Sequence, residues 1–153
     1  MPKSSQYNAT VVWKRGVNKF TDNKYSRAHQ WVFESGNIIA ASSSPHIVPL
    51  PYSIDENIDP EEAFVASLSS CHMLFYLSIA AKKNWVINHY EDRAIGTLEK
   101  NEEGKLAMTK VVLDPEIGYL ENTPSKEQEA EIHHLAHEAC FIANSVKTIV
   151  EIK

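Results

Sequence analysis

The order of apolar and polar residues in the first third of the chain predicts β-strands. The segments YNATVVWKRG and RAHQWVFESGNIIAAS are rich in β-branched and aromatic residues, and Ser35-Gly36-Asn37 supplies a turn inside the second segment. Residues 42–60 then contain four prolines, which exclude a regular helix and disfavour a central strand. We therefore expect an N-terminal meander of strands followed by a long loop.

A helical period replaces the strand pattern near residue 60. Asp59 is a suitable N-cap, and Pro60 fits the first position of a helix. Lys82 and Lys83 suit its C-terminal end. Within this segment the apolar positions recur at spacings of three and four residues, at Phe64, Leu68, Cys71 and Phe75. The period predicts a long core helix in which Cys71 faces inward.

Strand-like patterns return after this helix. Residues 85–101 and 105–114 are joined by the sequence NEEGK, which is typical of a hairpin turn. The final residues, VKTIVEIK, alternate between apolar and polar and predict a last strand. We expect these segments to form a second part of the sheet.

A second helix is predicted between the hairpin and the last strand. Ser125 and Gln128 have the spacing of a capping box, and Cys140 falls near the C-terminal end of this helix. The chain therefore has the order of an α+β fold, in which two helices pack on one face of an antiparallel sheet. At 153 residues, we expect one domain that covers residues 1–153.

Composition and charge remove several classes of function. Hydrophobic residues make up 43% of the chain and charged residues 23%, which is typical of a soluble globular protein. The net charge is −5 and the 15 basic residues form no stripe, so we expect no nucleic-acid partner. The pattern shows neither a secretion signal nor a long uninterrupted apolar segment, so we expect a cytoplasmic protein without a membrane partner. We also expect no cofactor and no bound metal.

The two cysteines, Cys71 and Cys140, are the first candidates for chemistry. A permanent disulfide is not expected in a reducing compartment, so the pair is either two unrelated buried thiols or a redox-active pair. A reactive thiol must ionise, and an apolar site opposes ionisation unless a cation lies close by. Cys71 is about three turns from the helix N-terminus, too far for the helix dipole to help. A side-chain cation is therefore required.

Arginine suits that role because it stays charged when buried. The chain has only three arginines, and Arg27, at the start of a predicted strand, is better placed for an interior position than Arg15 or Arg93. A buried guanidinium would need a carboxylate to hold it, and Glu61 is a candidate. Both residues also have ordinary explanations: Arg27 as a surface strand residue and Glu61 as a favourable charge at a helix start.

Three segments together resemble the OsmC/Ohr family, the osmotically inducible and organic hydroperoxide resistance peroxidases. DPEEAFVASLSSCHM is similar to the family's Pro-Glu-Glu/Gln-Leu-Phe…Cys signature, in which a glutamate precedes the first cysteine by ten residues, as Glu61 precedes Cys71. HEACFIANSVK resembles the segment around the family's second cysteine, here Cys140. YSRAHQW looks like the arginine-bearing strand of the OsmC-like branch. The resemblance extends from about Tyr25 to Ile152.

The resemblance implies an OsmC-like fold and a role for each of four residues. Cys71 would be the peroxidatic cysteine that attacks the hydroperoxide, and Cys140 would resolve its sulfenic acid as an intramolecular disulfide. Arg27 would hold the thiolate and polarise the peroxide, while Glu61 would orient the guanidinium. A lipoyl or other dithiol donor would reduce the disulfide. The resemblance also implies an intertwined homodimer.

Helix geometry adds a prediction about that dimer. Glu61 and Cys71 are separated by about 15 Å along a straight helix, too far to meet at one site. If they share a site, Glu61 of one chain serves Cys71 of another across an isologous interface.

The chain departs from the Ohr branch around Cys71. Ser69 and Ser70 replace small apolar residues, His72 follows the cysteine, and the double glycine before the arginine is absent. These differences place the chain in the broader OsmC-like group and leave open whether it prefers organic hydroperoxides or hydrogen peroxide. An apolar wall suited to an organic substrate would be formed by Phe64, Leu68, Met73, Leu74 and Phe75.

Other interpretations concern the histidines and the class of protein. His133 and His137 are four residues apart and could hold a metal, but we expect them to form a solvent-facing polar stripe. A dyad of Cys71 with His72 is disfavoured because adjacent helix positions point about 100° apart, so a packed or interface histidine is expected. The alternative function is a non-catalytic dimer that binds a small hydrophobic ligand and carries vestigial cysteines.

Overall fold

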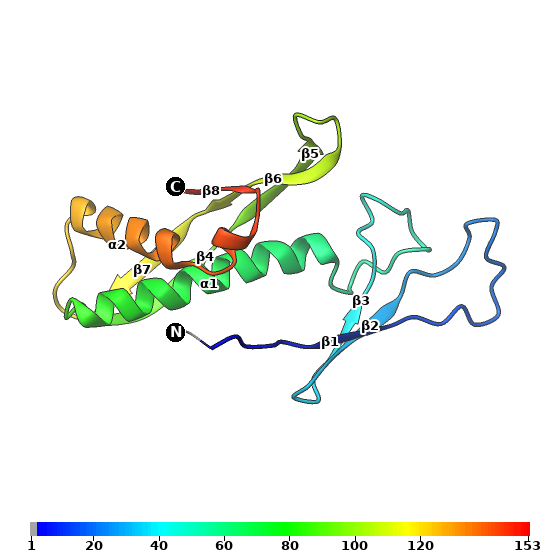
Figure 1. Ribbon diagram of the computed structural model, residues 1–153, viewed down its shortest axis with the longest axis horizontal. Coiled ribbons are helices and arrows are strands. Elements are labelled where there is room, and N and C mark those ends of the chain that lie inside the picture. Colours follow the sequence, from blue (N-terminus) through cyan, green and yellow to red (C-terminus); the bar gives the residue numbers. More distant parts are fainter. Residues whose placement is uncertain (1–2) are drawn as a thin grey trace. The chain divides into compact units, whose positions relative to one another are not determined.

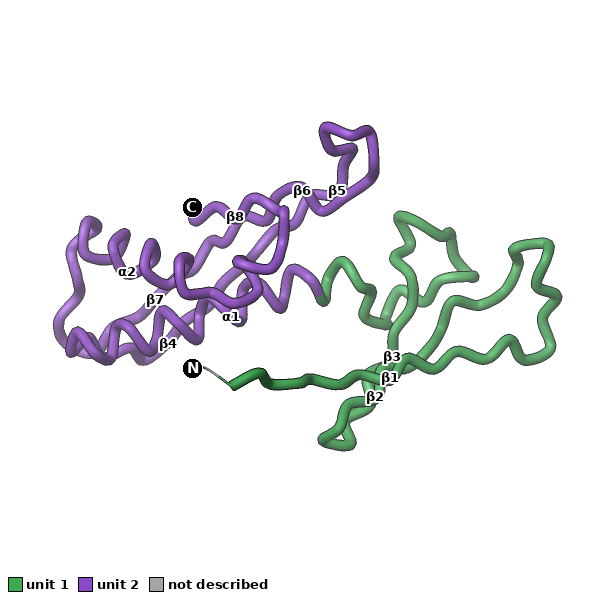
Figure 2. Tube along the Cα trace, viewed as in Figure 1, with its two compact units in different colours: residues 1–63 green, residues 64–153 purple. Residues whose placement is uncertain are grey.

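The computed structural model describes residues 3–153. The chain divides into a first unit that ends at Ala63 and a second unit that runs from Phe64 to Lys153 (Figure 2). Helices and strands occur in the order β1, β2, β3, α1, β4, β5, β6, β7, α2, η1 and β8 (Figure 1). This order confirms the predicted α+β class.

Three short antiparallel strands form the sheet of the first unit. They are β1 (Ala9–Val12), β2 (His29–Phe33) and β3 (Ile38–Ala41), in the order β1-β2-β3. The predicted turn joins β2 to β3, and Gly36 adopts φ +91° there, a left-handed conformation that glycine accepts without steric cost. The predicted N-terminal meander is therefore confirmed.

Side-chain hydrogen bonds order the proline-rich loop that follows β3. The Ser42 hydroxyl oxygen accepts the backbone N–H of Ile54 at 2.9 Å, and the Ser53 hydroxyl donates to the carbonyl of Val48 at 2.7 Å. Both serines are buried. A loop without regular structure thereby satisfies polar groups that burial would otherwise leave unpaired.

Helix α1 (Pro60–Lys82) begins where the sequence predicts. The Asp59 carboxylate accepts the backbone N–H of Glu62 at 2.8 Å, and the Glu62 carboxylate accepts the N–H of Asp59 at 3.2 Å. This reciprocal pair satisfies amides that have no partner inside the helix. Asp59 therefore acts as the predicted cap.

The buried stripe of α1 is shifted by one residue from the predicted stripe. Buried positions recur every fourth residue, at Leu68, His72, Tyr76 and Ala80, and Cys71 beside them is only half-buried. The helix is long and apolar enough to cross a membrane by length and composition alone. Core helices of soluble proteins meet the same two criteria, and this buried stripe packs inside the second unit.

The second unit contains two small sheets. Strand β4 (Ile87–Asp92) pairs antiparallel with β7 (Pro115–Tyr119). In the other sheet, β5 (Ile95–Lys100), β6 (Leu106–Leu113) and β8 (Ile149–Ile152) have the order β5-β6-β8. The β5–β6 hairpin is confirmed, whereas the predicted segment 85–101 is split between the two sheets. Strand β8 pairs with β6 in parallel, which the sequence did not predict.

Helix α2 (Lys126–Ala139) and the short 3-10 helix η1 (Ala143–Ser145) complete the second unit. Ser125 and Gln128 form the predicted capping box, with both reciprocal hydrogen bonds present. Two apolar clusters hold the unit together. In the first cluster α1 and α2 pack beside β4 and β7, and its buried members are Tyr76, Ala80, Ile132 and Ala136. In the second cluster α1 packs on β6, and its buried members are Leu68, Val111 and Leu113.

Candidate redox site

The two cysteines lie side by side in the second unit. Cys71 lies in the middle of α1 and Cys140 caps the C-terminal end of α2. Burial raises the pKa of the Cys140 thiol, the Ala143 N–H 3.4 Å from its sulfur lowers it, and the neighbouring Cys71 thiol raises it further. The two cysteines are not bridged, and Cys140 is buried whereas Cys71 is half-buried. A partly buried cysteine therefore adjoins a fully buried one.

Packing between the two helices explains how residues 69 positions apart become neighbours. Tyr76 and Ala80 of α1 are buried against Ile132 and Ala136 of α2. At the cysteine end, the rings of Phe75 and Phe141 meet edge to face, with centroids 4.9 Å apart. Aromatic pairs of this geometry add about 0.5–1.5 kcal/mol beyond their burial. The packed faces of the two helices thus bring the cysteines together.

Buried histidines lie next to the cysteine pair. His72 and His133 are stacked, with ring planes 11° apart, and Nε2 of His72 lies 2.9 Å from Nδ1 of His133. The Tyr76 ring contacts His133, with a centroid distance of 4.4 Å. His72 is therefore the packed histidine that was expected, but the prediction of a solvent-facing stripe at His133 and His137 is wrong. His133 is 8% exposed, because its position on α2 faces α1.

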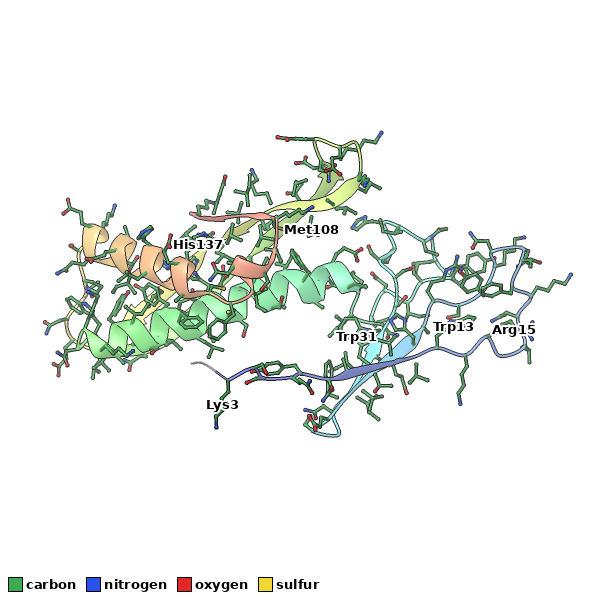
Figure 3. All side chains as sticks on the ribbon, in the orientation of Figure 1. Lys3, Trp13, Arg15, Trp31, Met108 and His137 are labelled. Atoms are coloured by element: carbon green, nitrogen blue, oxygen red, sulfur yellow. The ribbon has the colours of Figure 1, made fainter. Side chains whose placement is uncertain are left out.

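Burial keeps these histidines uncharged at neutral pH. The pKa of His72 is lowered to about 4, mainly by burial and also by His133 and His137, while Asp92 opposes the shift. Burial also lowers the pKa of His133 to about 4, again against Asp92. Within residues 3–153, Nδ1 of His72 and Nδ1 of His137 (Figure 3) are buried without a hydrogen-bond partner.

The histidines do not form a metal centre in this arrangement. Among residues 3–153, no three histidine, cysteine, aspartate or glutamate side chains converge as metal ligands. Neutral rings joined by a hydrogen bond are instead a structural link between α1 and α2. The sequence contained a signal for this link, because His133 precedes the buried Ala136 by three residues and Cys140 by seven, which places all three on one side of α2.

Arg27 and Glu61 belong to the first unit. The Arg27 guanidinium donates to the carbonyl of Asn23 at 3.0 Å and to its side-chain oxygen at 2.9 Å, and it lies 3.7 Å from the centre of the Tyr25 ring. Glu61 forms no ion pair with Arg27 within residues 3–63, and its Oε2 is buried with no hydrogen-bond partner in the described chain. Within one described chain, the guanidinium is thus held by its own loop.

The four residues predicted to bind substrate have different environments in the second unit. Leu68 is buried in the core, and Phe64 is partly buried beside it. Phe75 is half-buried against Phe141, whereas Leu74 is 59% exposed. The half-buried Phe75 and the exposed Leu74 are the members of this group that a ligand near Cys71 could contact.

The first unit has a pocket of about 390 Å³ with mainly aromatic walls. Phe20 stacks on Tyr25 at a centroid distance of 4.6 Å, and Trp13 (Figure 3) meets Tyr25 edge to face at 5.6 Å. Arg27 and His29 add polar groups to this wall. A pocket of this composition can accept a small apolar molecule that carries one polar end.

Comparisons with known proteins agree with the fold. The family model described as OsmC-like protein matches residues 54–153. An OsmC-like protein of unknown function from Vibrio cholerae is 54% identical over 98% of this chain and 99% of its own, with a TM-score of 0.96. No curated protein matches the chain.

More distant structures share the fold at low identity. An organic hydroperoxide resistance protein from Elizabethkingia anophelis has a TM-score of 0.73 at 17% identity, covering 100% of this chain and 96% of its own. An OsmC-like protein from Mycoplasma pneumoniae has a TM-score of 0.72 at 16% identity, covering 99% and 96%.

Proposed function

Since this chain belongs to the OsmC-like protein family, we propose that it is a thiol-dependent peroxidase that reduces organic hydroperoxides through Cys71 and Cys140. The observation that carries the proposal is the close approach of a half-buried cysteine to a fully buried one. A peroxidatic cysteine must be reached by substrate, whereas a resolving cysteine need only be reached by the sulfenic acid. The two thiols differ in exposure in this way.

The proposed cycle has two steps on the protein. In the first, the Cys71 thiolate attacks the terminal oxygen of ROOH, the O–O bond breaks, and the departing alkoxide takes a proton to leave as ROH. In the second, the Cys140 thiol condenses with the Cys71 sulfenic acid, which gives a Cys71–Cys140 disulfide and water. An external dithiol, lipoyl or another donor, then returns both cysteines to thiols by exchange and is itself oxidised to a disulfide.

Arg27 and Glu61 complete the proposed site. We assign Arg27 to the stabilisation of the thiolate and the polarisation of the peroxide, because arginine keeps its charge in apolar surroundings. Glu61 has a buried carboxylate oxygen without a partner in the described chain, so it has a hydrogen-bonding site free for a guanidinium. Glu61 and Cys71 are ten positions apart on one helix, too far to meet at one site. A shared site therefore requires that Glu61 comes from a second copy of the chain.

Exposed apolar side chains support the proposed homodimer. Six large hydrophobic residues on several elements of the second unit are more than half exposed. They are Leu74, Val86, Ile95, Leu106, Phe141 and Ile149. A homodimer would bury such side chains, and we propose that one domain of residues 1–153 is the dimerising unit. We also propose a cytoplasmic location, where a pair of free thiols such as Cys71 and Cys140 persists.

Steady-state turnover tests the proposal. We expect the wild-type protein to consume cumene hydroperoxide with dihydrolipoamide as the reductant, and we expect Cys71→Ser to abolish this activity. Ser70→Ala, a change at an exposed neighbour on α1, is the matched control and should retain turnover. Equal peroxide consumption by wild type and Cys71→Ser would reject the proposal.

A second function is favoured by the aromatic pocket of the first unit. It would make the protein a binder of small hydrophobic molecules rather than an enzyme. In that case the wild-type protein would bind an apolar fluorescent probe, and Trp13→Ala would weaken this binding. Neither the wild type nor Trp13→Ala would consume peroxide. The turnover experiment therefore separates the two functions.

A further inference from the structure

The hydrogen bond between His72 and His133 lies immediately beside the cysteine pair. His72 directly follows Cys71 on α1, and His133 precedes Cys140 by seven residues, or about two turns of α2. The 2.9 Å contact between the two rings joins the helices that carry the two cysteines. Any rotation or sliding of α1 against α2 would have to stretch or break it.

The apolar part of the contact between these helices fixes their register weakly. Its buried members are Tyr76, Ala80, Ile132 and Ala136, and apolar contact is non-directional. Two of the four are alanines, which offer small, smooth surfaces. A hydrogen bond between buried groups is directional, and losing it leaves polar nitrogens desolvated without a partner. The histidine pair therefore supplies the direct hydrogen bond between the two helices that distinguishes one register from its neighbours.

We propose that His72 and His133 are positioning residues for the redox pair, and that their hydrogen bond holds α1 and α2 in the register in which Cys71 and Cys140 can form a disulfide. The inference rests on the proposed function, because it concerns its resolving step. In that step the sulfenic acid of Cys71 and the thiol of Cys140 give a disulfide and water. Neither histidine takes part in the reaction.

Disulfide geometry explains why the register matters. A disulfide requires its two Cα atoms to lie about 4.4–6.8 Å apart, and sliding one helix by a single residue moves it by about 1.5 Å. A shift of one residue between the helices therefore changes the Cα–Cα distance by an amount comparable to the whole range that a disulfide permits. A pair of leucines could fill the same volume without specifying that distance.

Glutathione redox buffers test the inference without peroxide. In the test, the two protein thiols and oxidised glutathione exchange to give the Cys71–Cys140 disulfide and two reduced glutathione molecules, and the equilibrium gives the effective concentration of one thiol at the other. The informative variants are His133→Asn and His133→Gln. Asparagine can place an amide where Nδ1 lies, whereas the amide of glutamine reaches the position of Nε2. Both bury the same functional group, but only asparagine can restore the bond.

We expect His133→Asn to remain within about threefold of wild type and His133→Gln to lose about tenfold in effective concentration, equivalent to about 30 mV. The reciprocal pair at the other ring should behave in the opposite sense, with His72→Gln retaining the value and His72→Asn losing it. His134→Asn, at an exposed neighbouring position of α2, is the control and should match wild type. Far-UV circular dichroism checks that each variant is folded.

Because substitutions at His133 and at His72 each compare asparagine with glutamine, the test still works if the variants at one of these positions fail to fold. Equal values for asparagine and glutamine at both positions would overturn the positioning role while leaving the peroxidase proposal intact. A wild-type protein that forms no Cys71–Cys140 disulfide in any buffer would overturn both the proposed resolving step and this inference.

Discussion

The hydroxyl groups of Tyr76 on α1 and Tyr119 on β7 lie 2.7 Å apart in the second unit. Tyr119 also donates to Oε2 of Glu129 on α2, at 2.8 Å. One short chain of hydrogen bonds therefore connects both helices to the β4–β7 sheet. Burial raises the pKa of Tyr76 to about 12 and raises that of Tyr119 as well, so both hydroxyls stay protonated near neutral pH.

Replacing Tyr119 with phenylalanine is expected to destabilise the second unit. The change removes the hydroxyl in the middle of the chain and leaves the Tyr76 hydroxyl and the Glu129 carboxylate without this partner. We expect a loss of about 1–3 kcal/mol in the free energy of unfolding, measured by urea denaturation. Tyr7→Phe, at a tyrosine that is 92% exposed, is the control and should be neutral. Equal stability of Tyr119→Phe and wild type would show that the hydrogen-bond chain contributes nothing.

The buried histidines predict a loss of stability in mild acid. The pKa of each of His72 and His133 is about 4 in the folded protein, below the ordinary value of 6.5 that applies when the chain is unfolded. Between these values the unfolded chain binds more protons than the folded one, so stability falls as pH falls. The slope is at most about 1.4 kcal/mol per pH unit for each histidine.

Urea denaturation between pH 7 and pH 4 measures this slope. Other groups act on the same rings, since His137 lowers the pKa of His72 and Asp92 raises that of both histidines. Carboxylates also titrate near the lower end of the range, so the informative quantity is the difference between wild type and His133→Asn. We expect a shallower slope in the variant. Identical slopes would mean that His133 is already accessible to protons in the folded state.

A close approach at Gly96 on β5 predicts a third effect. A Cβ atom at this position would lie 2.5 Å from Cγ2 of Val65 and 2.6 Å from Cε of Met108. Both contacts are too short, and Val65 belongs to the apolar cluster that fixes α1 to the β5-β6-β8 sheet. We therefore expect Gly96→Ala to lower the free energy of unfolding by about 1–3 kcal/mol.

Gly118→Ala on β7 provides the matched control for this prediction. A Cβ atom there would meet its nearest neighbour, the Cβ of His89, at 3.6 Å, which is an ordinary van der Waals contact. Thermal unfolding should therefore separate the two glycine variants. A melting temperature that falls equally in both would point to a loss of strand flexibility rather than to the contacts of Gly96.

Local sequence signals predicted the beginnings of both helices correctly. Asp59 before Pro60, and Ser125 three residues before Gln128, act through hydrogen bonds within one turn, so neighbouring residues contain all the information. The same holds for the turn at Gly36, where the backbone needs a left-handed conformation.

Long-range contacts were less accessible to prediction. The parallel pairing of β8 with β6 depends on where the chain returns after α2, which no local pattern specifies. The sequence places His133 on a solvent-facing stripe because its partner His72 lies 61 positions away, and the hydrogen bond between them forms only when the helices pack. The cysteine pair was predicted from a family resemblance, and the packing of α1 against α2 explains it physically. The roles of Arg27 and Glu61 stay predictions.

The most direct test of the proposed function is a count of free thiols in the reduced protein before and after one equivalent of cumene hydroperoxide, followed by peptide mapping. We expect wild type to lose both thiols and to yield a Cys71–Cys140 disulfide, whereas Cys140→Ser should accumulate a sulfenic acid at Cys71 that dimedone traps. Cys71→Ser should keep its remaining thiol. Survival of both thiols in the wild-type protein after exposure to the hydroperoxide would contradict the account.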